Sequence, residues 1–83
     1  MNIHEIRELA TNYSVDELER RARALMKAHA DEIVHDPVIS ESFNSLVKAK
    51  MVRSLIDSGM STNDSIRELG RTMRRAVGRI DRD

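Results

Sequence analysis

A glutamate and a histidine near the middle of the chain have the spacing that comes closest to a metal site. Glu32 and His35 are three residues apart, and two such side chains on one helix face can hold an ion in carboxylate-bridged bundles. That site needs further glutamates and a second copy of the motif. His29 is six positions from His35, the wrong spacing for a shared ion, although its titration near neutral pH leaves a pH-sensing role open. We therefore expect no metal ion and no cofactor.

Residues for covalent or acid–base catalysis are not brought together by the sequence. The chain has no cysteine, which excludes thiolate nucleophiles, disulfides and thiolate metal ligands. No serine lies in a Gly-x-Ser-x-Gly turn, and the three glycines are too far apart for a phosphate-binding loop. We expect a protein that is not an enzyme.

The strongest chemical pattern is a series of arginines in residues 61–83. At about 100° per residue they share an arc of about 140° on one helix face, and apolar residues share about 100° on the opposite face. The arginine ridge consists of Arg67, Arg71, Arg74, Arg75, Arg79 and Arg82. The apolar seam consists of Ile66, Leu69, Met73, Ala76, Val77 and Ile80. These are the candidate residues for binding a partner or phosphates.

Repulsion within the arginine ridge indicates an anionic ligand. Three pairs of its arginines lie four residues apart, and each pair destabilises the helix by roughly 0.2–0.5 kcal/mol. Asp64 and Glu68 can offset only its N-terminal end, while the helix dipole favours cations near the C-terminus. The rest would be relieved by carboxylates of this chain, by carboxylates of a partner, or by phosphates. The plain alternative is a solvated face whose long side chains shield the seam.

Residues 55–82 also bear a superficial likeness to a helix-turn-helix unit with its turn at Gly70 and a recognition helix over 72–82. Against this, Ile66 stands where a small residue is usual and Arg71 where an apolar one is usual. The apolar seam also crosses Gly70 without a change of phase, as in one continuous helix. This alternative would make the chain a duplex nucleic-acid-binding protein that contacts phosphates through the same arginines, with strong salt dependence.

Four helices, one short and three longer, are predicted to carry these residues. They cover residues 2–12, 15–35, 37–58 and 61–83. Ser14 and Glu17 predict a capping box at the start of the second helix. Asp36 and Pro37 separate the second helix from the third, because proline disfavours helix before it and suits the first helical position.

Two glycines bear on the C-terminal ends of the third and fourth helices. Gly59 is predicted in the left-handed position that ends the third helix. Ser61 then starts the fourth, with Asp64 three residues later. Gly78 lies within the arginine ridge, but Ile80 stays in phase with the seam, so we expect the helix to continue past Gly78.

The third segment is apolar on two opposite sides. One side contains Ile39, Phe43, Leu46 and Val47, and the other contains Val52, Leu55 and Ile56. Either it is a central helix with neighbours on both sides or it breaks into two pieces, and we prefer the central helix. A helix with two apolar sides needs more cover than two other long helices readily give. We therefore predict an all-α fold, an antiparallel helical bundle completed by homodimerisation.

Composition is consistent with this fold and limits the partners. The 83 residues suit a single helical domain over 1–83. No apolar run approaches a membrane span, and we expect a cytoplasmic protein. Residues 1–47 have five basic and nine acidic groups, a net charge of −4, and residues 48–83 have nine basic and five acidic groups, a net charge of +4. We expect a protein–protein interaction module whose arginine ridge binds an acidic partner or its own second protomer, with no membrane contact.

Overall fold

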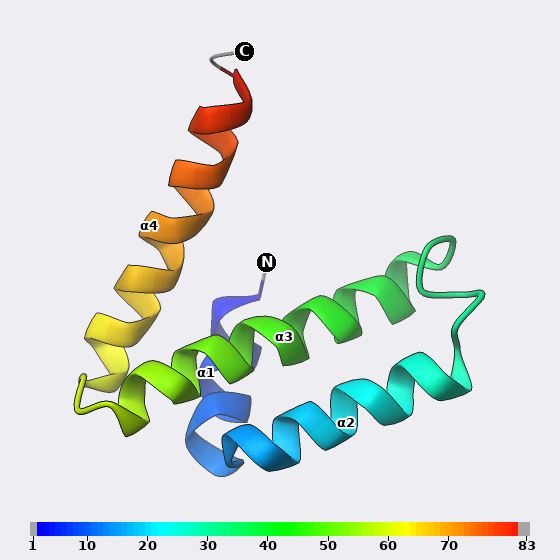
Figure 1. The fold of residues 1–83 in the computed structure, drawn as a ribbon, viewed down its shortest axis with the longest axis horizontal. Helices are drawn as coiled ribbons and strands as arrows, with labels where there is room; N and C mark the ends of the chain where they lie inside the picture. Colours follow the sequence, from blue (N-terminus) through cyan, green and yellow to red (C-terminus); the bar gives the residue numbers. More distant parts are fainter. Residues whose placement is uncertain (1, 82–83) are drawn as a thin grey trace.

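The computed structural model describes the backbone of residues 2–81 and the side chains of residues 2–75. Its elements are α1 (Ile3–Asn12), α2 (Val15–Ala28), α3 (Pro37–Asp57) and α4 (Thr62–Asp81), and the described residues form no strand (Figure 1). The predicted all-α fold of one short and three longer helices is confirmed. The helical backbone of α4 also continues past Gly78, as expected.

Each helix begins next to a side chain that accepts a hydrogen bond from the backbone of its first turn. These capping residues are Asn2, Ser14, Asp36 and Ser61. Such caps satisfy N–H groups that have no partner within the helix. The capping box at Ser14 is only half formed, because the Glu17 carboxylate pairs with Arg20 at 2.7 Å and Arg21 at 3.2 Å instead.

The second helix is shorter than predicted and ends at Ala28, not near His35. Residues 29–35 form successive turns, closed by bonds such as that from the Asp36 N–H to the Glu32 carbonyl at 2.7 Å. None of these turn residues is buried, and Val34 is 80% exposed. A helix gains most of its stability from packing its apolar face, and this segment has little to pack against. The prediction was wrong because it followed the periodicity of the sequence alone.

Helix α3 is the centre of the molecule and contacts all three other helices. It is a single helix, which confirms that choice between the two alternatives. Its small or β-branched residues Ser45, Ala49 and Val52 are buried and let the neighbouring backbones approach closely. The fully buried apolar core consists of Ile6, Ala10, Leu18, Ala49, Val52 and Leu69.

The four helices do not all lie along one another. Helices α2 and α3 run side by side in opposite directions, whereas α4 leaves the end of α3 at a steep angle and rises away from it (Figure 1). Only the first part of α4 lies close to α1 and α3 in this view. The molecule is accordingly flat, with extents of 37 × 34 × 18 Å. It has the shape of an L, whose arms are the α2–α3 hairpin and α4.

The turn between the two arms is a Schellman motif. Gly59 has φ +111°, its N–H donates to the Ile56 carbonyl at 3.0 Å, and the Met60 N–H donates to the Leu55 carbonyl at 3.1 Å. These are the two bonds that define this C-terminal cap. Gly59 therefore occupies the left-handed position predicted for it.

Alanine at Gly59 and alanine at Gly70 should have opposite effects on stability. Gly59→Ala should lower the free energy of unfolding by about 1 kcal/mol, because a Cβ disfavours positive φ even though it would meet no atom within 4 Å. Gly70→Ala should raise it by up to about 1 kcal/mol, because Gly70 is inside α4 and a Cβ there meets only the end of Arg74 at 3.7 Å. Urea denaturation of the two variants beside the unmodified chain measures both, and the same sign for both would contradict this account of the turn.

Candidate arginine interface

The exposed side of α4 carries the arginines that the sequence singled out. Arg67, Arg71, Arg74 and Arg75 are all exposed, while Leu69 on the other side of the helix is fully buried. Ile66 and Met73 of the apolar seam are half-buried against the core. The side chains of the other ridge members, Arg79 and Arg82, lie outside the described residues.

Two arginines of the ridge hold carboxylates of their own helix. An Arg71 Nη1 lies 2.9 Å from Glu68 Oε2, and an Arg67 Nη1 lies 3.6 Å from Asp64 Oδ1. Both pairs are largely exposed, and exposed ion pairs contribute only about 0–1 kcal/mol because water screens them. They leave most donors of each guanidinium group available to a ligand.

The next turn of the ridge is less neutralised. Among the side chains of residues 2–75, no carboxylate lies within 4.0 Å of Arg74 or Arg75. Over the same residues, no carboxylate of α1, α2 or α3 pairs with any arginine of the ridge. The acidic first half of the chain therefore does not cover these four arginines within one protomer.

The anchor of α4 lies in its first half. Leu69 and Ser65 are both fully buried, against a core that includes Ile6 and Ala10 of α1. Ser65 is small enough for close approach, but its Oγ is buried without a hydrogen-bond partner in the described part of the chain. The later turns of α4 lie farther from the other three helices (Figure 1), although Met73 still packs against the core. The arginines are therefore displayed on a projecting arm.

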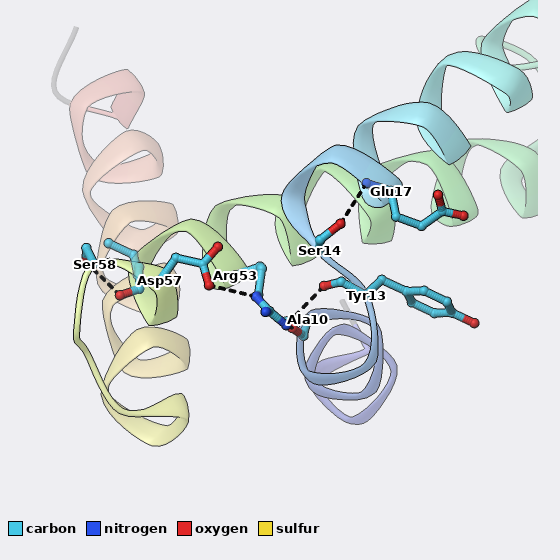
Figure 2. A network of polar contacts seen from close by, with 8 residues as sticks. Ala10, Tyr13, Ser14, Glu17, Arg53, Asp57 and Ser58 are labelled. Carbon is cyan, nitrogen blue, oxygen red and sulfur yellow. Dashed lines mark hydrogen bonds and ion pairs between the residues drawn. The ribbon is translucent and has the colours of Figure 1, made fainter.

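A fifth arginine is structural, and sequence analysis missed it. Arg53 of α3 donates from Nη1 to the carbonyls of Ala10 and Tyr13, each at 3.3 Å, and from Nε to Asp57 at 2.9 Å (Figure 2). The two carbonyls lie at the C-terminal end of α1, where helical carbonyls lack partners. Close by, the guanidinium of Arg21 stacks over the Tyr13 ring at 4.0 Å. Nothing in the sequence pattern marks Arg53, because its partners are 40 and 43 residues away.

The Glu-x-x-His spacing does not produce a helical ligand pair. Glu32 and His35 are both in the turn segment, and Glu32 Oε2 lies 3.2 Å from His29 Nδ1. In the described residues no group of three or more His, Asp or Glu side chains could hold a metal ion. His29 is half-buried and occupies the C-cap position of α2.

A shallow groove of about 190 Å³ runs between α2 and α3. Its lining residues are Glu19, Ala22, Arg23, Met26, Phe43, Val47 and Lys50. Met26 and Val47 are about half exposed, so one of the two apolar sides of α3 is only partly covered. The charged side chains at its rim already contact one another, with Glu19 3.1 Å from Arg23 and 3.5 Å from Lys50, and they make no nucleophile–base arrangement.

The helix-turn-helix alternative required a turn at Gly70, and the structure has none there. Gly70 lies inside α4, whose helix is unbroken from Thr62 to Asp81. Residues 72–81 therefore continue α4 and do not form a separate recognition helix. Phosphate contact through the same arginines would have to use one long, straight helix face.

Comparisons of the chain with protein-family models, with curated proteins and with solved structures found no match. Within the described residues, none of the helices has both the length and the apolar character needed to span a bilayer. The function is therefore inferred from the chain's own surface.

Proposed function

We propose that the chain is a non-enzymatic protein–protein interaction module that binds an acidic protein surface through the arginine ridge of α4. The observation that supports this is the exposure of Arg67, Arg71, Arg74 and Arg75 on one face of a projecting helix, where the side chains described up to residue 75 engage two carboxylates of that helix. Arginine suits the role because its planar group can grip a carboxylate through two parallel hydrogen bonds. Like-charge repulsion along the helix is relieved when the partner binds.

An acidic protein is a better ligand for this face than a nucleic acid. The described side chains include two aromatic rings, Tyr13 and Phe43, and neither belongs to α4, so the helix that carries the arginines supplies no ring of its own to stack on an unpaired base. A duplex would still be able to contact the arginines through its phosphates. It would also meet the repulsion of carboxylates elsewhere on a chain whose net charge is zero.

Charge reversal on α4 tests the proposal. The variant Arg71→Glu/Arg75→Glu should lose, by about tenfold or more, the proteins that the immobilised unmodified chain retains from an extract of its own cells. The matched control is Arg7→Glu/Arg20→Glu, which changes the net charge equally at two exposed positions of α1 and α2. The control should retain the same proteins, because Arg20 loses only a surface pair with Glu17.

The nucleic-acid alternative is tested with labelled duplex DNA in the same series. We expect no retardation of the duplex at low ionic strength. Binding that falls steeply with salt and disappears in Arg71→Glu/Arg75→Glu would replace the protein partner by a duplex. Identical retention of proteins by all three chains, without DNA binding, would show that the ridge is a solvated face.

A further inference from the structure

The tip of the α2–α3 hairpin has the opposite chemistry to α4. This hairpin tip, residues 29–41, consists of the connecting turns and the first turns of α3. Val34 is 80% exposed and Val38 is 72% exposed, the two most exposed large apolar side chains described. Apolar side chains gathered on an exposed surface are typical of contact sites. The hairpin tip therefore offers an apolar contact beside its charged groups.

The charges of the hairpin tip and of residues 69–80 of α4 are equal and opposite. From Ala28 to Val47 the chain has four carboxylates and no lysine or arginine; they are Asp31, Glu32, Asp36 and Glu41. From Leu69 to Ile80 it has four arginines and no carboxylate; they are Arg71, Arg74, Arg75 and Arg79. Opposite charge on two surfaces both steers their encounter and fixes their register.

Within one chain these two surfaces are kept apart. The hairpin tip is at one end of α3 and α4 starts at the other end (Figure 1), a separation of about 30 Å for a helix of this length. Among the described side chains, Glu32 contacts only His29, and neither Asp31 nor Glu41 has an ion-pair partner. The carboxylates are therefore as available as the arginines.

The L shape allows two copies to join these surfaces reciprocally. Its arms have similar lengths, because α3 has 21 residues and α4 has 20. A second copy turned by 180° about an axis perpendicular to the L (Figure 1) brings the end of each α4 to the hairpin tip of the other copy. Such a two-fold pair uses the same two patches twice and closes on itself.

We infer that the acidic partner is a second copy of this chain, in which the arginines of α4 in each protomer bind the partner's hairpin tip, at Asp31, Glu41 and the exposed Val34 and Val38. This inference rests on the proposed function and names its partner. It also accounts for an exposed apolar tip beside unpaired carboxylates. The dimer that it describes has two identical ionic interfaces at opposite corners.

Complementary charge variants test the pairing. The α4 variant is Arg71→Glu/Arg75→Glu, and the tip variant is Asp31→Lys/Glu41→Lys, which leaves the Asp36 cap and the Glu32–His29 contact in place. Each variant alone should dimerise about tenfold or more weakly than the unmodified chain, because the altered patch falls from four charges to a net charge of zero and its new side chains face like charges of the partner. An equimolar mixture should dimerise again, because each mixed pair has one original interface and one with both charges exchanged. Sedimentation at several concentrations and low ionic strength distinguishes 9.5 kDa protomers from pairs, and circular dichroism checks that the variants are folded.

Cysteine crosslinking gives a second measurement that does not depend on the charge variants. The chain has no cysteine of its own, so the double variant Val38→Cys/Arg75→Cys should form an oxidised covalent dimer. The single variants Val38→Cys and Arg75→Cys should not, since identical positions lie at opposite corners of the pair.

Three results would overturn the inference. They are a monomer mass for the unmodified chain at every concentration, unchanged dimerisation of the tip variant, and failure of the mixture to recover the dimer. In any of these cases the α4 variant can still capture fewer proteins from the extract than the unmodified chain does. The proposed function then holds, with an acidic partner other than a second copy. If the α4 variant changes neither the mass nor the captured proteins, both proposals fail.

Discussion

Leu69→Ala should lower the free energy of unfolding by about 3 kcal/mol, the lower middle of the range for truncating a buried leucine. Leu69 is fully buried, and among the described side chains of α4 it is the one apolar residue with no exposed surface. Its removal leaves a cavity where α4 meets α1 and α3. A domain of this size is stable by roughly 4–12 kcal/mol, so the loss is a large fraction of the total.

Urea denaturation followed by circular dichroism measures this change. Ile66→Ala is the matched control, because Ile66 is a half-buried neighbour on the same helix and its truncation should cost less than half as much. Amide exchange should also accelerate in α4 more than in α2, because α4 loses its main contact with the core. A loss below about 1 kcal/mol for Leu69→Ala would mean that α4 is held elsewhere.

Arg53→Met should lower the free energy of unfolding by about 2 kcal/mol, although it changes a charged residue at the edge of the core. The side chain of Arg53 is 28% exposed and supplies donors to the carbonyls of Ala10 and Tyr13 and to Asp57. Methionine fills a similar volume but donates nothing, which leaves the two carbonyls without that donor. A partly buried acceptor that loses its partner costs about 1–3 kcal/mol.

Two further variants separate the hydrogen bonds of Arg53 from its charge. Arg53→Lys keeps the charge but loses the planar fork, so it should recover only part of the lost stability. Asp57→Asn removes the exposed ion pair alone and should cost under about 1 kcal/mol. Urea denaturation of the three variants gives the order, and an Asp57→Asn effect as large as that of Arg53→Met would show that the ion pair, not the α1 carbonyls, matters.

Local chemistry in the sequence predicted most of the helix boundaries correctly. Ser14, Asp36 and Ser61 cap their helices because their side-chain oxygens reach backbone N–H groups two or three residues ahead. Gly59 ends α3 because no other residue type adopts positive φ at so little cost. These signals depend on neighbours in sequence, and they do not need the tertiary structure.

Features that depend on distant contacts were not predicted. The end of α2 at Ala28 reflects a lack of packing partners beyond it, and the periodicity of the sequence cannot show this. The steep angle between α3 and α4 and the hydrogen bonds from Arg53 to the end of α1 likewise involve residues far apart in the chain. For the candidate site, the sequence placed the arginines on one helix face and named Asp64 and Glu68 as the carboxylates near its N-terminal end, which the structure confirms. Only the structure shows that, among the described side chains, no carboxylate of α1, α2 or α3 pairs with these arginines.

Among the described side chains of α4, Leu69 is the one apolar side chain that is fully buried, which makes the helix a lever whose fulcrum is at Leu69. From Leu69 to Asp81 the arm is about 18 Å long, so a tilt of about 10° carries its far end about 3 Å sideways. That displacement is about as large as the donor–acceptor distance of a hydrogen bond. The packing around Leu69 therefore determines where the guanidinium groups of α4 are positioned. A substitution that changes the volume of a core side chain beneath Leu69 would shift these groups without changing any charge.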